Sequence, residues 1–161
     1  MGRCLRLEEL LSIRDTLRSE GKRIVFTNGC FDILHRGHVE FLNRAKSYGD
    51  VLVVGLNSDA SMRRIKGKGR PIVPEEDRAF ILSNLLAVDY VSIFEDDTPL
   101  KLITAVRPDV LVKGADWDAE EIVGRDVVES AGGLVANIPL VPNRSTTDIV
   151  KKIVKDFRDC E

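Results

Sequence analysis

Apolar residues recur along this chain in two alternating patterns, a helical spacing and a short continuous run. The helical spacing is first seen in a set of leucines that ends at Gly21, and it predicts a helix over residues 6–20. The run IVF at 24–26 then has the continuous apolar character of a strand buried in a parallel sheet. The chain therefore opens as a helix followed by a buried strand.

The same alternation continues to the end of the chain. Further strands are predicted at 51–56, 90–94, 110–112 and 134–138, and further helices at 37–48, from Pro74 to about Leu86, from Thr98, around 119–131 and from about 145. This order predicts an α/β fold, a doubly wound open parallel sheet of about five strands with helices on both faces. Ligands of such sheets lie beyond the carboxyl ends of the strands, so motifs that directly follow a strand are candidate sites.

The composition of the chain limits its domain number, its charge-based partners and the state of its cysteines. With 161 residues, 43% of them hydrophobic, we expect one domain over 1–161. The net charge of −2 gives no global positive field for a nucleic acid. No segment resembles a signal peptide or a membrane span, so a cytoplasmic protein is expected. The three cysteines, Cys4, Cys30 and Cys160, fit neither a disulfide framework nor a zinc site, and free thiols are expected.

Both histidines of the chain, His35 and His38, lie in the segment NGCFDILHRGH at 28–38, just after the first predicted strand. Spaced by three, they share one face of the next helix. The N-terminus of that helix offers free N–H groups and a partial positive charge, and Gly37 lets a ligand approach the backbone. The segment therefore predicts an anion site. Structural packing is the alternative for the two histidines, and metal binding is disfavoured because no third ligand follows at the usual spacing.

A basic stretch, RRIKGKGRPIVPEEDR at 63–78, follows the second strand. Lys66 and Lys68 alternate with glycines, which predicts a mobile loop that closes over a polyphosphate. Arg78 lies on the helix that follows. A merely solvated loop is the alternative, and it is the usual role of a charge run. The stretch belongs to the same edge of the sheet as the histidines, so its position leaves both a binding role and a solvated loop open.

The segment LVKGADW at 111–117 ends the fourth predicted strand. Asp116 can accept hydrogen bonds from ribose hydroxyls, and Trp117 offers a flat apolar wall with one donor. A simple turn formed by Gly114 and Asp116 is the alternative, and the local sequence by itself favours that turn.

The segment NRSTTDIV at 143–150 follows the last predicted strand. Ser145 and Asp148 fit a capping box that opens an apolar-striped helix. Capping is compatible with catalysis, because this helix N-terminus would also point into the crevice. Arg144 would then neutralise developing phosphate charge.

HRGH resembles the HxGH signature of the nucleotidyltransferase superfamily that includes the cytidylyltransferases, and it is similar to the HIGH motif of class I aminoacyl-tRNA synthetases. The GADW and STT segments resemble further motifs of that superfamily. The resemblance implies a Rossmann-like nucleotidyltransferase fold. It also implies a reaction in which a phosphate acceptor attacks the α-phosphorus of a Mg²⁺-bound nucleoside triphosphate and pyrophosphate leaves.

The same resemblance implies roles for individual residues. The catalytic residues it implies are His35, His38, Lys66 and Arg144. The nucleotide-binding residues it implies are Asn28, Gly29, Cys30, Phe31, Asp32, Gly37, Lys68, Arg78, Lys113, Gly114, Asp116, Ser145, Thr146 and Thr147. Acceptor binding is assigned to Asp32 and Trp117. Mg²⁺ carried by ATP is the expected cofactor, with no metal site on the protein.

From Arg23 to about Ile153 the chain resembles the adenylyltransferase domain of the ADP-heptose synthases of lipopolysaccharide biosynthesis. The segments that carry this resemblance are FTNGCFDILHRGH, LNSDAS, GRPIVPEEDR, EDDTP, VRPDVLVKGADW and STTDIVKKI. It implies transfer of AMP from ATP to D-glycero-β-D-manno-heptose 1-phosphate. It further implies a homodimer that acts with a separate heptose kinase, with no nucleic-acid or membrane partner.

Two residues, Trp117 and Arg144, are more like the glycerol-3-phosphate cytidylyltransferases than the heptose enzymes. That activity, an FAD synthase-like activity and a non-catalytic nucleotide-binding module therefore remain as alternatives.

Overall fold

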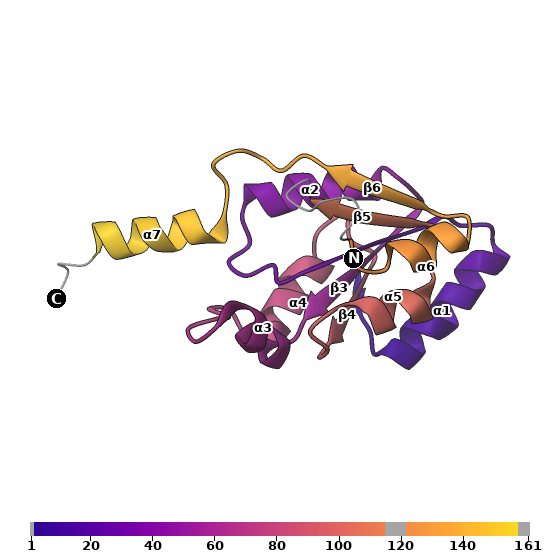
Figure 1. Cartoon of the computed structure of the whole chain (residues 1–161), viewed down its shortest axis with the longest axis horizontal. Helices are drawn as coiled ribbons and strands as arrows, with labels where there is room; N and C mark the ends of the chain where they lie inside the picture. The colour runs from indigo at the N-terminus through magenta and orange to yellow at the C-terminus, as the bar shows by residue number, and fades with distance from the viewer. Residues whose placement is uncertain (1, 115–121, 158–161) are drawn as a thin grey trace.

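The computed structural model describes residues 2–114 and 122–157, which form a parallel sheet with helices on both faces (Figure 1). The strands are β1 (Arg3–Cys4), β2 (Ile24–Gly29), β3 (Val51–Asn57), β4 (Tyr90–Phe94), β5 (Val110–Gly114) and β6 (Leu134–Ile138). The helices are α1 (Leu7–Ser19), α2 (Arg36–Lys46), α3 (Asp59–Lys66), α4 (Glu75–Ser83), α5 (Leu100–Val106), α6 (Arg125–Ser130) and α7 (Thr146–Asp156).

The strand order is β1-β4-β3-β2-β5-β6, and every pairing is parallel. The chain builds outward from β2 through β3 to β4, then returns to the other side of β2 for β5 and β6. This confirms the predicted doubly wound sheet. The topological switch point lies between β2 and β5, and in this class of fold that is where a ligand binds.

The ladder between β2 and β5 is short. It pairs Val25 with Val110 and Phe26 with Leu111. Both strands continue beyond these pairs, β2 to Gly29 and β5 to Gly114, whereas β2 and β3 stay paired along the whole of β2. The carboxyl-terminal ends of β2 and β5 are therefore unpaired to each other, which opens a crevice at the switch point.

The core consists of two apolar clusters, one on each face of the sheet. Successive residues of β2 alternate between them, with Val25 in one cluster and Ile24 and Phe26 in the other. The first cluster includes side chains from α2 and α4, and the second includes side chains from α1, α5 and α6. Burial on both faces explains why these strands read as continuous apolar runs in the sequence.

Two elements differ from the sequence-based expectation. The sheet has a sixth strand, β1, which pairs at the edge with Tyr90 and Val91 of β4. The stretch expected to be a loop begins with a helix, α3, whose N-cap Ser58 accepts a hydrogen bond from the backbone N–H of Ser61. Lys66 is therefore the last residue of a helix, and the loop proper begins at Gly67.

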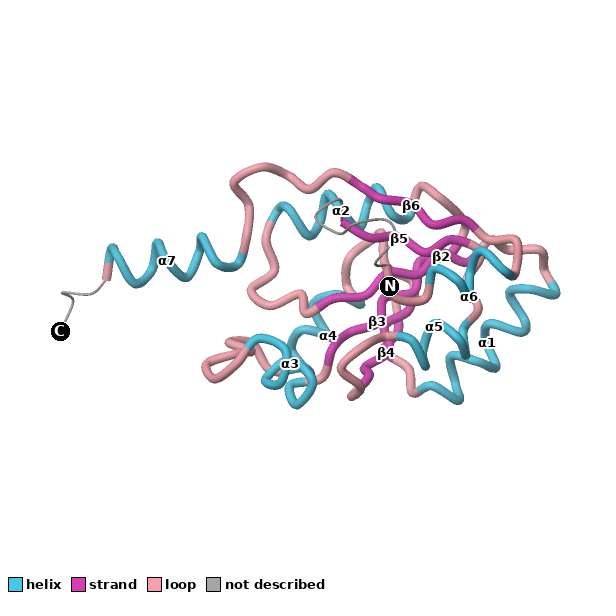
Figure 2. The backbone as a smooth tube through the Cα atoms, in the orientation of Figure 1, coloured by secondary structure: helices cyan, strands magenta, loops and turns pink. Residues whose placement is uncertain are grey.

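Helix α7 points away from the sheet (Figures 1 and 2). It has no buried residue, and Ile153, Val154 and Phe157 are exposed. No helix in the described part of the chain is long and apolar enough to cross a membrane.

Candidate active site

A cavity of about 800 Å³ lies at the carboxyl ends of the strands, at the switch point. The predicted residues in its lining come from four separate stretches of the sequence. The predicted residues that line it are Asn28, Gly29, Cys30, Phe31, Asp32, His35, Gly37, His38, Lys66, Lys113, Gly114, Arg144, Ser145, Thr146 and Thr147. The predicted convergence of the motifs on one edge of the sheet is therefore observed.

Some predicted site residues are not part of this lining. Lys68 is exposed on the loop after α3, between Gly67 and Gly69, and Arg78 is buried on α4. Asp116 and Trp117 lie outside the described residues. The predicted ligand contacts of these four residues remain predictions.

The two imidazoles are stacked at the entrance to α2. Their ring centroids are 3.8 Å apart with an angle of 20° between the planes, and the ring of Phe31 meets His38 edge-on at 5.3 Å. His35 is the N-cap of α2, and its Nδ1 accepts the backbone N–H of Gly37 at 3.1 Å. A neutral imidazole that accepts at Nδ1 carries its proton on Nε2. The cap therefore leaves the Nε2–H of His35 as a donor for a ligand.

Both histidines are held in their neutral form. Burial lowers the pKa of His35. Burial and the neighbouring His35 together lower the pKa of His38 to about 4, against an opposing effect of Asp32. The Nδ1 atom of His38 is buried and has no hydrogen-bond partner among the described residues. At neutral pH the pair therefore offers N–H donors rather than full positive charges.

A side-chain contact bridges β2 and β5 where their backbone pairing has ended. The ammonium of Lys113 on β5 donates to the Oδ1 of Asn28 on β2. Lys113 is only 8% exposed, so its charge is fixed at the floor of the crevice. This places one cation beneath any ligand that enters the switch point.

The start of α7 and the start of α2 meet across the cavity. A Cβ added at Gly37 would lie 2.9 Å from the Cε1 of His35 and 3.2 Å from the Cβ of Arg144. Glycine is therefore required at position 37 by its neighbours in the protein, in addition to any approach of a ligand. The hydroxyl of Ser145 accepts the N–H of Asp148 at 3.1 Å, as the capping prediction states.

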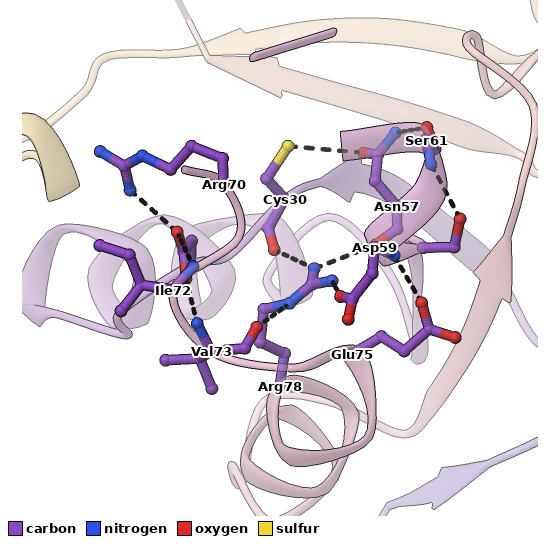
Figure 3. A network of polar contacts seen from close by, with 11 residues as sticks. Cys30, Asn57, Asp59, Ser61, Arg70, Ile72, Val73, Glu75 and Arg78 are labelled. Carbon is purple, nitrogen blue, oxygen red and sulfur yellow. Dashed lines mark hydrogen bonds and ion pairs between the residues drawn. The ribbon is translucent and has the colours of Figure 1, made fainter. Parts of the chain in front are cut away.

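Arg78 has a different environment from the one its predicted role suggests (Figure 3). Its guanidinium donates to the carbonyls of Val73, Cys30 and Asn57 at 2.9, 2.6 and 2.9 Å. It also donates to Asp59 Oδ1 at 2.7 Å. The residue is 2% exposed, and these bonds connect the ends of β2 and β3 to the starts of α3 and α4. Arg78 thus holds together the elements that carry one side of the site.

The cysteine of the first motif is not poised for nucleophilic chemistry. Burial raises the pKa of the Cys30 thiol, and this outweighs the opposing effects of Lys66, Arg78 and Arg70. Since the thiolate is the reactive form, Cys30 lines the cavity as a neutral side chain.

Several residues that line the cavity were missed by the motif analysis. They are Phe41, Asn57, Met62, Ile65, Arg70, Asp97, Thr98, Pro99, Ile122, Val123, Leu140 and Val141. Met62 and Ile65 belong to α3. They are three residues apart and follow the capping residue Ser58, and this pattern could have predicted the helix from the sequence. Arg70 lies within the basic stretch, but its partner, Asp32, comes from a distant segment.

The cavity contains two carboxylates from the described residues, Asp32 and Asp97. The described residues contain no group of three or more side chains arranged to hold a metal ion. Mg²⁺ is typically bound by one or two carboxylates together with substrate phosphates. Asp32 is already paired with Arg70 and Asp97 with Arg64, so a Mg²⁺ ion in this cavity would be held chiefly by substrate phosphates.

A family model and curated proteins match most of this chain. Residues 26–152 match the family model described as cytidylyltransferase-like. The bifunctional protein HldE of Geobacter metallireducens is 56% identical over 151 residues, which cover 94% of this chain and 31% of the relative. The HldE of Wolinella succinogenes is 54% identical over the same shares of both chains. The chain thus spans about a third of the length of these relatives.

Solved structures share the fold of this chain. A lipopolysaccharide core biosynthesis protein from Thermoplasma volcanium is 30% identical with a TM-score of 0.63, covering 75% of this chain and 98% of that one. Pantoate-beta-alanine ligase from Francisella tularensis, at 17% identity and a TM-score of 0.63, covers 99% of this chain and 80% of that one and shares the fold. The family match and the relatives together show that this chain belongs to the cytidylyltransferase-like family of nucleotidyltransferases.

Proposed function

We propose that the protein moves AMP from ATP to D-glycero-β-D-manno-heptose 1-phosphate, giving ADP-heptose and pyrophosphate for the lipopolysaccharide core. The observation that carries this proposal is a single cavity that holds both histidines, Lys66, Arg144 and the N-terminus of α7. The relatives named HldE, which match 94% of the chain, and the similar protein of lipopolysaccharide core biosynthesis support the choice of product.

The chain contributes positioning and charge stabilisation to this reaction. An oxygen of the acceptor phosphate attacks the α-phosphorus, the bond from that phosphorus to the bridging oxygen breaks, and pyrophosphate leaves. The acceptor phosphate is already ionised at neutral pH, so no general base is required. The Nε2–H of His35, the ammonium of Lys66 and the guanidinium of Arg144 stabilise charge that develops on the phosphoryl oxygens. The free N–H groups at the start of α7 add to this stabilisation.

Mg²⁺ is proposed to enter with ATP. It would neutralise the triphosphate and be held chiefly by phosphate oxygens and water, in keeping with the few carboxylates of the cavity. The chain's own cations then act on oxygens that the metal leaves free.

The test is a product analysis by mass spectrometry. The protein is incubated with ATP or CTP against heptose 1-phosphate, glycerol 3-phosphate and flavin mononucleotide, and pyrophosphate release is followed in parallel. We expect ATP and heptose 1-phosphate to give ADP-heptose and a stoichiometric amount of pyrophosphate. CDP-glycerol or FAD as the product would replace this function with another of the same reaction class. Nucleotide binding without any pyrophosphate would indicate a non-catalytic module.

The proposed setting is the cytoplasm, where a sugar kinase supplies the heptose 1-phosphate.

We also propose a homodimer in which a second copy covers the exposed apolar face of α7. That face carries Ile153, Val154 and Phe157, and no side chain of α7 is buried by the rest of the described chain. Analytical ultracentrifugation of the wild-type protein and of Phe157→Asp tests this. A wild-type monomer would overturn it.

A further inference from the structure

The carboxylate of Asp32 already has its hydrogen-bond partners within the protein. Its Oδ1 accepts the N–H of Val73 at 2.9 Å and that of Ile72 at 3.1 Å. Its Oδ2 accepts the N–H of Ile72 at 3.0 Å and the Nη1 of Arg70 at 2.8 Å. The side chain is 2% exposed. A carboxylate has about four acceptor positions, so these donors fill it and leave little capacity for substrate hydroxyls.

Asp32 is charged despite its burial. Burial alone would raise the pKa of this carboxyl, but the N–H groups of Val73 and Ile72 and the guanidinium of Arg70 together lower it below its usual value. A lone buried anion would repel a phosphate that enters the same cavity. The ion pair with Arg70 removes that repulsion and leaves a guanidinium at the cavity wall.

Arg70 has donors to spare. Its side chain is 21% exposed and lines the cavity, and among the described residues only its Nη1 has a hydrogen-bond partner. The ammonium of Lys113 is bonded to Asn28, whereas Arg144 resembles Arg70 in this respect, since its Nη1 donates to the carbonyl of Asn143 at 2.8 Å and the described residues leave its other N–H groups for a ligand. A guanidinium is planar, so an arginine held on one edge by a carboxylate can present its other N–H groups to a phosphate.

We propose that Arg70 is a phosphate-binding residue of the transfer reaction and that Asp32 is the residue that positions it. This inference rests on the proposed function. The ligand is a phosphoryl group of either substrate, the nucleoside triphosphate or the sugar phosphate. Figure 3 shows Arg70, Ile72 and Val73 gathered around one carboxylate, with Val73 also accepting a hydrogen bond from Arg78 through its carbonyl.

Asp32 also connects this loop to the opposite wall of the cavity. Its backbone carbonyl accepts the hydroxyl of Thr146, at the start of α7, at 2.6 Å. Its neighbours Phe31 and Ile33 have φ angles of 48° and 45°, in the left-handed region that non-glycine residues seldom adopt. The backbone on either side is thus held in a specific conformation, and one residue sets the distance between the loop at 70–73 and the start of α7.

The first experiment is steady-state kinetics of Arg70→Met and Arg70→Lys with each substrate varied in turn. Losing a hydrogen bond to a charged group costs about 1.5–3 kcal/mol, which corresponds to roughly 10- to 100-fold in binding. We expect a KM increase of that size for one substrate. An increase for ATP assigns Arg70 to the triphosphate, and an increase for heptose 1-phosphate assigns it to the acceptor. Lysine should restore only part of the loss, because it lacks the planar fork.

The matched control is Arg6→Met, which removes an exposed arginine paired with Glu9 on α1. It should leave both KM values unchanged. Unchanged KM and kcat in Arg70→Met would overturn the proposal, as would equal effects of Arg70→Met and Arg6→Met.

The second experiment tests the positioning role without relying on turnover. Amide hydrogen exchange at Ile72 and Val73 should accelerate in Asp32→Asn but not in Arg70→Met, because only the first variant weakens the acceptor of those N–H groups. The double variant that combines Asp32→Asn with Arg70→Met should have a KM no higher than that of the more impaired single variant, because both substitutions remove the same interaction. Unchanged exchange in Asp32→Asn, or fully additive KM effects, would contradict it.

A third measurement separates this inference from the proposed function. Calorimetric binding of pyrophosphate to the wild type and to Arg70→Met requires no catalysis and no particular acceptor. If the wild type makes no ADP-heptose yet binds pyrophosphate more tightly than Arg70→Met, the substrate assignment is wrong and the phosphate site is right. If the wild type makes ADP-heptose but Arg70→Met has the same pyrophosphate affinity and the same KM values, the proposed function stands and the role of Arg70 is wrong.

Discussion

Two ion pairs near the basic stretch have opposite exposures. In the pair of Arg78 with Asp59, the arginine side chain is 1% exposed and the carboxylate 23%. In the pair of Arg70 with Asp32, the arginine is 21% exposed and the carboxylate 2%. The first guanidinium has protein carbonyls around it, whereas the second lies at the cavity wall with donors left over.

The difference in exposure indicates which of the two arginines is available to bind a ligand. A buried cation surrounded by carbonyls stabilises the fold, because it satisfies acceptors that would otherwise be orphaned. A buried anion that holds a cation at the cavity wall orients that cation, so that its remaining N–H groups can bind an anionic ligand. The sign of the buried partner therefore separates a structural arginine from a binding one, although both lie in one short stretch of sequence.

Arg78→Met tests the structural half of this comparison and should have the largest effect. It leaves Asp59 and the carbonyls of Cys30 and Asn57 without their donor. Breaking a buried pair of this kind costs about 3–5 kcal/mol. Urea denaturation followed by circular dichroism measures the free energy of unfolding, and Arg6→Met is again the control. A loss below about 1 kcal/mol would contradict the structural role of Arg78.

His38→Ala should affect turnover rather than folding. Removing one preorganised donor to a developing oxyanion typically costs about 10²- to 10³-fold in kcat, or about 3–4 kcal/mol in the activation barrier. We expect that loss with the circular dichroism spectrum unchanged. A variant that folds and turns over normally would remove His38 from the catalytic residues.

The histidines also predict a pH dependence of stability. His38 has a pKa of about 4 in the folded protein against 6.5 as its ordinary value. As the pH falls, the unfolded chain binds this proton first, so the free energy of unfolding should decrease between about pH 6.5 and about pH 4. The contribution is fully present above that window. The free energy of unfolding is measured by urea titration at about pH 7 and at about pH 5. The difference between the two values should be smaller in His38→Gln than in the wild type, and an equal difference would argue against a neutral His38.

Asp59→Asn should have the smallest effect of the four. The side chain is partly exposed, so water can replace part of the lost contact, and the Arg78 guanidinium keeps its carbonyl partners. A loss of about 1 kcal/mol in the free energy of unfolding is expected. A loss as large as that of Arg78→Met would mean that the carboxylate, and not the carbonyls, accounts for the role of Arg78.

The parallel strands were predictable because each is buried on both faces and reads as an apolar run. Strand β1 was not, since it has two exposed residues and forms only by pairing with β4. Helix α3 was missed because glycines and lysines beyond it dominate the composition of that stretch. Its capping residue, Ser58, was the signal in the sequence.

The candidate site was predictable as a set of motifs that follow strands, and only partly as a set of contacts. The role of Arg78 depends on carbonyls of Cys30 and Asn57, and that of Arg70 depends on Asp32. The fold brings these groups together from distant parts of the chain. No local pattern records such partners, so sequence reasoning placed Arg78 near phosphate and did not single out Arg70.

The early end of the ladder between β2 and β5 has an evolutionary consequence. Asn28, Gly29, Lys113 and Gly114 lie past the last backbone pair joining those strands, and all four line the cavity. Replacing a side chain there alters what the crevice accepts while Val25, Phe26, Val110 and Leu111 keep the two halves of the sheet attached. A lineage can thus acquire a new substrate at this position without having to rebuild its scaffold.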